Sequence, residues 1–185
     1  GRRAGNICEA ILNLAGGDRP EPSEINLGEL VRATLDAMAR DPRKDGIELT
    51  LSIPADLTLV TWPSRLQQVV LNLLMNARAA LLARPGLRRI ELSAEADDET
   101  VVLRVSDNGV GISREDLAKI FQAFYTTRKD APGQARGHGL GLTICHDIVS
   151  EMGGRIEVSS APNQGAVFTV RLPRTVSSPP TARSA

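Results

Sequence analysis

Apolar residues recur at helical spacing in several segments of the chain, so that each segment has one apolar face. Start and stop signals support these helices: Asn26 can cap a helix, Pro63 suits a first helical position, and Gly153 with Gly154 can end one. The spacing predicts four longer helices and a shorter one, over residues 6–14, 27–39, 64–82, 139–152 and 114–121.

Other segments alternate apolar and polar residues, as half-buried strands do. They predict six strands: at 47–53 and 57–61, at 89–96 and 100–106 joined by an acidic turn, and at 155–160 and 166–172 as a last hairpin. Helices and strand pairs follow one another along the chain. This order predicts an α+β fold, a two-layer α/β sandwich with a mixed, mostly antiparallel sheet and about three helices on one face.

Composition narrows the class of function. The 22 Lys and Arg balance the 22 Asp and Glu, which argues against a mainly electrostatic nucleic-acid binder, and 3% aromatic residues argue against a base-stacking platform. Cys8 and Cys145 cannot form a disulfide scaffold, and no apolar run approaches the ~20 residues of a membrane span. We expect a soluble, cytoplasmic domain that makes no direct membrane contact, although its full-length protein could be membrane-anchored.

The motif DNGVG begins with Asp107, directly after the strand VVLRVS. Gly109 and Gly111 let the backbone come close to a flat ligand, while the carboxylate accepts from a donor such as an adenine amino group. A turn without any ligand explains this motif, taken alone, at least as well.

A second glycine motif, GHGLGL, opens the last long helix. Gly137, Gly139 and Gly141 leave backbone N–H groups bare at a helix N-terminus, where the helix dipole favours a polyphosphate. The spacing is not that of a Rossmann fingerprint, and no Gly-Lys-Ser/Thr follows as in a P-loop.

Two asparagines, Asn72 and Asn76, lie at i and i+4 on one face of the long helix. Asparagine is a mediocre helix former, so two of them amid Leu, Val and Met need an explanation. An amide oxygen can ligate Mg²⁺ that is shared with substrate phosphates. A buried amide bond between helices is the alternative.

Five segments together resemble the catalytic, ATP-binding domain of sensor histidine kinases. They correspond in order and separation to its N, G1, F, G2 and terminal boxes, and read QQVVLNLLMNA, DNGVG, FQAFYTTR, GHGLGL and GGRIEVSSAPNQGAVFTVRLP. The resemblance covers roughly residues 27–173, and the wording of the N and F boxes is closest to nitrogen-regulator (NtrB-like) kinases.

This resemblance implies a Bergerat (GHKL) fold that holds ATP and Mg²⁺ between its helices. By position, Asn76 would ligate Mg²⁺, with Asn72 at the mouth of the same site. Asp107 would accept from the adenine amino group. The base would fit beside Gly109 and Gly111, and the phosphates would be wrapped by the turn made of Gly137, His138, Gly139, Leu140, Gly141 and Leu142.

The resemblance also implies a mobile lid over residues 126–136, whose glycine and charge content suits a segment that closes on ATP. Phe121 and Phe124 would hold one end of this lid. Thr127 would contact ATP. We expect Arg128 and Arg136 to act at the γ-phosphate together with Asn72; Lys129 is a further candidate, and a solvated loop is the alternative for each cation.

One position separates the classes within this fold. Related GHKL ATPases, such as type II topoisomerases and mismatch-repair proteins, carry a Glu one turn before the Mg²⁺ asparagine, where this chain has Asn72. An amide cannot act as a general base near neutral pH, so slow hydrolysis is expected, as suits a kinase. Trp62 stands where an Asp commonly precedes this helix; loss of that cap costs ~1 kcal/mol, and we expect the Trp to pack there instead.

The implied activity is that of a protein-histidine kinase, which transfers the γ-phosphate to a His on a dimerisation helical hairpin for relay to a response-regulator Asp. His138 and His146 are the two histidines of the sequence, and neither is set in such a hairpin motif. The expected partners are that hairpin, in a homodimer, and a response regulator. The expected organisation is the end of a dimerisation helix, a linker, the catalytic domain and a disordered tail, over 1–17, 18–26, 27–173 and 174–185.

Three other functions stay open at this point. An anti-sigma-type Ser/Thr kinase shares the fold, and would be supported by phosphorylation of a Ser on its partner. A non-catalytic binding module would have lost ATP, which the complete set of Asn76, Asp107 and glycines argues against. An ATPase clamp is disfavoured by Asn72.

Overall fold

The computed structural model describes residues 21–125 and 140–176 of the chain. Their helices and strands, in chain order, are β1 (Ser23–Asn26), α2 (Leu27–Ala37), the 3-10 helix η1 (Pro42–Asp45), β2 (Ile47–Ser52), β3 (Thr58–Thr61), α3 (Pro63–Leu82), β4 (Arg88–Ala96), β5 (Thr100–Asp107), α4 (Arg114–Leu117), α5 (Gly141–Glu151), β6 (Arg155–Ser160) and β7 (Ala166–Pro173).

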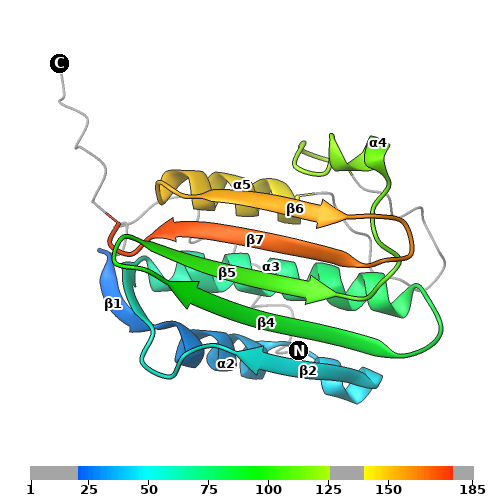
Figure 1. Ribbon diagram of the computed structural model, residues 1–185, viewed down its shortest axis with the longest axis horizontal. Helices are drawn as coiled ribbons and strands as arrows, with labels where there is room; N and C mark the ends of the chain where they lie inside the picture. Colours follow the sequence, from blue (N-terminus) through cyan, green and yellow to red (C-terminus); the bar gives the residue numbers. More distant parts are fainter. Residues whose placement is uncertain (1–20, 126–139, 177–185) are drawn as a thin grey trace, which may run out of the picture.

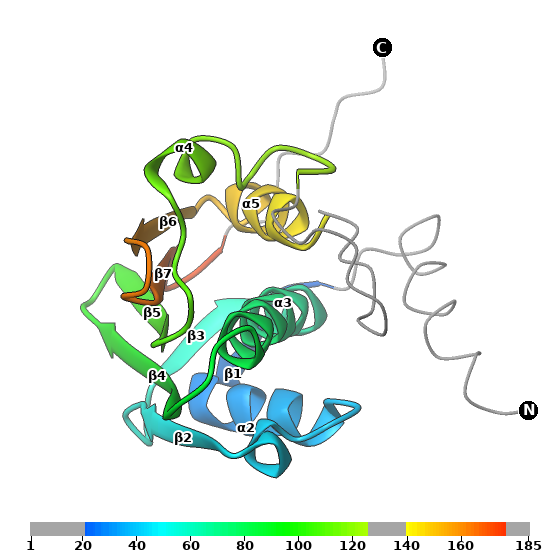
Figure 2. The same cartoon turned by 90° about the vertical axis from the view of Figure 1, so that its right-hand side faces the viewer.

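Five strands form the main sheet, in the order β2-β4-β5-β7-β6 (Figure 1). The pair β2 and β4 is parallel, and the other neighbours are antiparallel. Figure 2 shows α2, α3 and α5 side by side in a second layer against one face of the sheet. The predicted α+β sandwich, with a mixed and mostly antiparallel sheet under three helices, is therefore confirmed. No helix in the described ranges combines the length and the apolar character that crossing a bilayer requires.

The core lies between the two layers, and α3 contributes most of its helical part. Its buried side chains recur at the predicted spacing, from Leu66 through Leu73 and Leu74 to Leu81, all of which are fully buried. From the sheet, Leu92, Leu103 and Val170 face them. Burying a side chain of this size stabilises the fold by about 1.5–3 kcal/mol, so the α3 face alone is a major part of the folding free energy.

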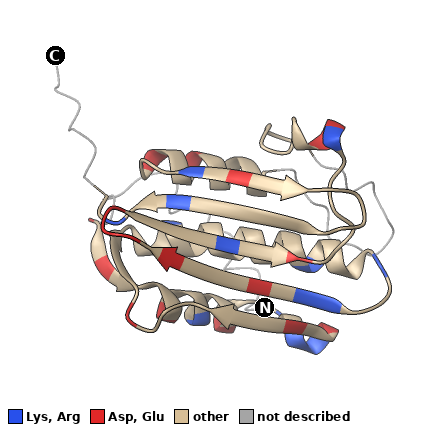
Figure 3. Cartoon of the chain, in the orientation of Figure 1, with Lys and Arg blue, Asp and Glu red and all other residues tan. Residues whose placement is uncertain are grey.

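The other face of the sheet is polar and carries both charges (Figure 3). Ion pairs connect its strands: Arg89 with Glu48, Arg104 with Glu95, and Arg171 with Glu157. All three pairs are solvent-exposed, and such pairs contribute little each. This face is therefore held by the backbone ladder and by the core beneath it.

The helix ends follow the sequence signals. The side chain of Asn26 accepts from the backbone N–H of Glu29 at 2.9 Å and caps α2. Pro63 is the first residue of α3, and no side-chain bond caps that helix at Trp62. Trp62 is 8% exposed, so its predicted packing at the helix start is confirmed. Gly153, with a φ of +74°, ends α5 as predicted.

Two segments differ from the predictions. Within the expected linker 18–26, Ser23–Asn26 form β1, which pairs with β3 in a separate two-stranded sheet. At the other end, the disordered tail was predicted to begin at residue 174. Val176 is nevertheless buried, and its N–H donates to the carbonyl of Val60 at 3.0 Å. Folded structure therefore continues past residue 173 to Val176. Residues 1–17 of the expected dimerisation helix lie outside the described ranges.

The short helix after β5 also ends earlier than predicted. The α4 helix stops at Leu117, and turns bonded to the carbonyl of Asp116 follow it. Ser113 caps this helix by accepting from the N–H of Asp116. Local turn bonds thus replace the last predicted helical turn.

Candidate functional site

One face of α3 connects the two glycine-containing motifs. Asn72, Asn76 and Ala80 lie at i, i+4 and i+8, and therefore one above another. At one end, Nδ2 of Asn72 donates to the carbonyl of Gly141, the first residue of α5, at 3.3 Å. At the other end, the carbonyl of Ala80 accepts from the N–H of Val110 at 3.3 Å. Eight residues at 1.5 Å each separate the two contacts by about 12 Å, with half-buried Asn76 between them.

Asp107 ends β5 and is buried, with 7% of its surface exposed. Burial is the main cause that raises the pKa of its carboxyl from 3.8 to about 6, and backbone hydrogen bonds from Gly109 and Ala166 oppose this rise. The Gly109 N–H donates to Oδ1 at 2.8 Å. A carboxylate that is this costly to ionise gains from a further donor, which is what the sequence predicted for this position.

The glycines of the loop 107–111 are required by packing within the protein. A Cβ on Gly109 would lie 2.7 Å from the Cβ of Ala80. Gly111 has a φ of +69°, and a Cβ there would overlap the carbonyl oxygen of Ala161. The resemblance implied that these glycines make room for a base. The packing of the loop requires glycine at both positions whether or not a base lies beside it.

Asn108 anchors the same loop to the beginning of β4, a role that the motif did not reveal. Its Oδ1 accepts from the N–H of Arg89 at 2.7 Å, and its Nδ2 donates to the carbonyl of Leu87 at 2.9 Å. Both the oxygen and the nitrogen of the side-chain amide are thereby bonded within the protein. Asn108 is a structural residue of the loop.

The glycine motif at α5 is described only in part. Leu140 stands at the N-cap, Gly141 begins the helix, and Leu142 packs against the core. The remaining predicted residues of the motif and the lid lie outside the described residues: Gly137, His138 and Gly139, with Thr127, Arg128 and Arg136. The structure thus brings Asn72 to the described part of the motif.

The segment that leads to residue 125 is held by two aromatic residues. Phe121 packs against the core, and its carbonyl accepts from the hydroxyl of Thr143 on α5 at 3.2 Å. The hydroxyl of Tyr125 donates to Asp116. Phe124, which was expected to hold the lid with Phe121, is 76% exposed. Tyr125, rather than Phe124, is the residue whose side chain bonds to α4.

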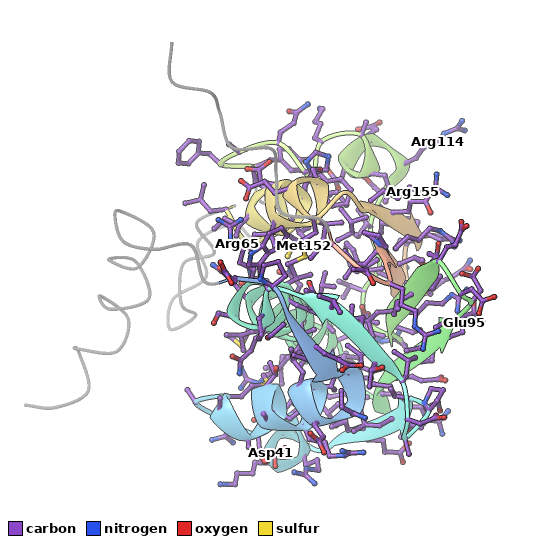
Figure 4. The ribbon with its side chains drawn as sticks, turned by 90° about the vertical axis from the view of Figure 1, so that its left-hand side faces the viewer. Asp41, Arg65, Glu95, Arg114, Met152 and Arg155 are labelled. Atoms are coloured by element: carbon purple, nitrogen blue, oxygen red, sulfur yellow. The ribbon has the colours of Figure 1, made fainter. Side chains whose placement is uncertain are left out.

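The contact between α3 and α5 is otherwise structural. Cys145 is fully buried, and its Sγ lies 3.8 Å from the carbonyl of Val69; burial raises the pKa of its thiol to about 12. Arg65 near the start of α3 forms an ion pair with Glu151 near the end of α5 (Figure 4 labels Arg65). Cys145 therefore packs between the two helices, whereas the side chain of His146 is half-exposed.

The amides of α3 are candidate ligands of a metal ion. In the described ranges, no three His, Cys, Asp or Glu side chains gather in a way that could hold one. The amide oxygen of Asn76 is a hard ligand of the kind that suits Mg²⁺. It lies on the α3 face between Asn72 and Ala80, and therefore between the two motifs.

Comparisons with known proteins identify the family of the chain. Residues 62–176 match the family model of the histidine kinase-, DNA gyrase B- and HSP90-like ATPases. The sensor histidine kinase ZraS of Klebsiella oxytoca is 33% identical over 172 residues, which are 92% of this chain and 36% of ZraS. The chain thus spans about a third of that relative.

Solved structures extend the comparison to the fold. The catalytic domain of histidine kinase ThkA superposes with a TM-score of 0.70 at 32% identity, over 84% of this chain and 97% of that domain. ThkA in complex with the response regulator protein TrrA gives 0.70 at 30% identity, over 94% of this chain and 48% of the ThkA chain. Full-length ShkA in complex with AMPPNP gives 0.74 at 26% identity, over 97% of this chain and 38% of ShkA. The chain therefore belongs to the histidine kinase-, DNA gyrase B- and HSP90-like ATPase family, as a catalytic domain of the sensor histidine kinase type.

Proposed function

We propose that this domain binds Mg·ATP along the α3 face and supplies the γ-phosphate to a histidine on a dimerisation helical hairpin. The observation that carries the proposal is the alignment of Asn72, Asn76 and Ala80 between Gly141 and the loop 107–111. A nucleotide on this face would meet the buried Asp107 carboxylate at one end and the N-terminus of α5 at the other.

Each end of the face supplies a different kind of interaction. Asp107 would accept from the exocyclic amino group of adenine, which offsets the cost of keeping its buried carboxylate ionised. The N-terminal N–H groups of α5, with the predicted turn residues 137–139, would donate to phosphate oxygens. When bound, Mg²⁺ neutralises phosphate charge, and Asn76 would hold it.

Phosphoryl transfer in such a site depends on positioning and charge neutralisation. The domain would hold the triphosphate in line with an imidazole nitrogen of the acceptor histidine, with ADP as the leaving group. Arg128 and Arg136 are the proposed contacts of the γ-phosphate. Asn72 cannot take a proton from water, so hydrolysis would be slow.

The partners of the whole protein are part of the proposal. Because ThkA forms a complex with a response regulator, we expect a response-regulator aspartate to receive the phosphate from the histidine. We also expect residues 1–17 to end the second helix of the hairpin, and the whole protein to act as a homodimer with this domain in the cytoplasm.

Calorimetric titration of the chain with AMPPNP, with and without Mg²⁺, tests the proposal. Asn76→Ala should weaken binding mainly in the presence of Mg²⁺, because it removes the proposed ligand. Asp107→Ala should weaken binding in both conditions. Glu91→Ala, which removes an exposed carboxylate from the neighbouring strand, is the matched control and should bind as the wild type does.

The outcomes separate the possible functions. Binding that falls with both substitutions, followed by transfer of ³²P from ATP to an added histidine-bearing hairpin, supports the kinase. Label on a serine of an added protein would instead favour a Ser/Thr kinase. A folded wild-type domain that gives no heat at millimolar AMPPNP would refute ATP binding and with it the proposed function.

A further inference from the structure

Arg84, just after the end of α3, makes an unusual set of contacts. Its Nη1 lies within hydrogen-bond distance of three backbone carbonyl oxygens, those of Asn108 at 2.9 Å, Gly109 at 3.3 Å and Asn163 at 3.4 Å. Within the described ranges, no carboxylate forms an ion pair with this guanidinium. Arg78 and Arg89 differ in this respect, since Arg78 pairs with Asp45 and Arg89 with Glu48.

The three carbonyls come from two segments that lie far apart in the sequence. Asn108 and Gly109 belong to the loop that follows β5, and Asn163 belongs to the turn between β6 and β7. Figure 1 shows the end of α3, the end of β5 and the β6–β7 turn at the same end of the molecule. Arg84 therefore connects the end of α3 to both segments, whose strands β5 and β7 are paired in the sheet as far as Asp107 and Ala166.

The turn and the loop also bond directly to each other. The N–H of Asn163 donates to the carbonyl of Val110 at 2.7 Å. Asn163 has a φ of +62°, a left-handed conformation that asparagine tolerates better than most residues do. Its backbone thus contacts the loop through its N–H group and Arg84 through its carbonyl.

We propose that Arg84 is a positioning residue for recognition of the adenine base: its guanidinium holds the loop 107–111 against the turn 161–165 and thereby fixes the Asp107 carboxylate in place. This inference rests on the proposed binding of ATP. Arg84 acts on the carbonyls of the two residues that follow Asp107. Three converging carbonyl oxygens repel one another, and a cation that donates to all of them removes that repulsion.

The consequence is specific to the base. If the loop relaxes when the cation is removed, the Asp107 carboxylate loses its fixed position toward an adenine amino group. Guanine presents a carbonyl at the equivalent position, and gains nothing from an acceptor there. Discrimination between the two bases should fall, while contacts with the phosphates and Mg²⁺ at the other end of the α3 face remain.

Arg84→Met tests this role, because methionine keeps the apolar stem and removes the donors. Calorimetry on the chain should show that the ratio of affinities for AMPPNP and GMPPNP falls about tenfold or more, as expected for lost hydrogen bonds to a charged group. Arg84→Lys, which keeps a cationic donor, should restore part of that ratio. In an Asp107→Asn background, Arg84→Met should have no further effect on it.

Arg88→Met is the matched control. Arg88 also donates to backbone carbonyls, those of Leu81 at 3.3 Å and Asp45 at 3.0 Å, but neither belongs to the loop or the turn. Its loss should lower stability and leave the ratio unchanged. If Arg84→Met does not fold by circular dichroism, Arg84→Gln decides the test.

The results distinguish the two proposals. A folded Arg84→Met domain with the wild-type ratio would overturn the positioning role and leave ATP binding intact. Equal effects of Arg84→Met and Arg88→Met on the ratio of affinities would also overturn the positioning role. The ratio would then respond to the loss of any arginine that bonds to backbone carbonyls, and not to the contacts of Arg84 with the loop and the turn. A wild-type domain that binds neither nucleotide would overturn the proposed function itself.

Discussion

Replacing Asp107 by Asn should make the ligand-free domain more stable and its nucleotide binding weaker. Asp107 is buried, and burial raises the pKa of its carboxyl from 3.8 to about 6. At about 1.4 kcal/mol for each tenfold change in the protonation equilibrium, this difference corresponds to about 3 kcal/mol of unfavourable free energy when the carboxylate is charged. Asparagine has the same shape and removes the charge.

The hydrogen bonds from Gly109 and Ala166 favour the charged carboxylate, and their effect is already contained in the raised pKa. The expected stabilisation at pH 7.5 is therefore about 3 kcal/mol. For a domain of this size, the melting temperature should rise by roughly 9 °C. Affinity for AMPPNP should fall about tenfold or more, because a hydrogen bond to a charged acceptor is lost.

The pH dependence tests the cause. Because the pKa is raised in the fold, the folded state binds a proton at higher pH than the unfolded state does, and the penalty is complete only above about pH 6. As the pH falls through 6 toward 3.8, the wild type should regain this stability. The difference in the free energy of unfolding between wild type and Asp107→Asn should then nearly disappear at about pH 4. Urea unfolding at pH 4, 5, 6 and 7.5 measures it.

Glu91→Gln is the control for loss of one negative charge from an exposed position on β4, and should change stability little at any of these pH values. If Asp107→Asn is no more stable than the wild type at pH 7.5, or if its advantage does not depend on pH, the desolvation of Asp107 is not the controlling term.

Three further changes test the fold around the site. Gly111→Ala should destabilise the domain by about 3 kcal/mol or more in urea unfolding, because Gly111 has a left-handed backbone and an added Cβ would overlap Ala161. The control Gly86→Ala, also at positive φ but with open space around it, should cost about 1 kcal/mol. Equal costs would refute the packing argument. Asn26→Ala should lower stability by about 1 kcal/mol or more, because it removes both the cap of α2 and the bond from Nδ2 to the carbonyl of Ala55. Asn26→Ser keeps a capping oxygen and should lose less; equal losses would show that the cap is not the cause. Val176→Asp should lower the thermal midpoint if the segment after β7 is part of the folded domain, and an unchanged midpoint would contradict its burial.

Local patterns predicted most of the fold, because each long helix and most strands carry their own periodicity. The α3 helix is the clearest case, since its apolar residues and Pro63 mark both its extent and its buried face. β1 was missed because Ser23–Asn26 follow two prolines and show no alternation; they become a strand only by pairing with β3. The parallel pairing of β2 with β4 likewise depends on distant residues and leaves no local trace.

For the site, the sequence predicted the residues that would face a ligand and missed those that support them. Asp107 stands out because it directly follows a buried strand and precedes two glycines, in a motif that resembles a known family. Asn108 and Arg84 do not stand out, because both act on backbone groups, and any donor side chain at those positions would look the same in a sequence. Supporting residues of this kind become visible only when the elements are placed in space.

The periodicity of α3 couples the core to the site. Its core residues recur at i, i+3, i+4 and i+7, and the same turn places Asn72, Asn76 and Ala80 on the adjoining face. Because Asn72 bonds to α5 and Ala80 bonds to the loop after β5, packing of the core fixes the distance between the two motifs. Within this rigid frame, Asp107 lowers the stability of the ligand-free domain, because its carboxylate is buried. A domain can retain such a group because the surrounding core is stable enough to hold it in position, and functional sites are where that kind of destabilisation is expected.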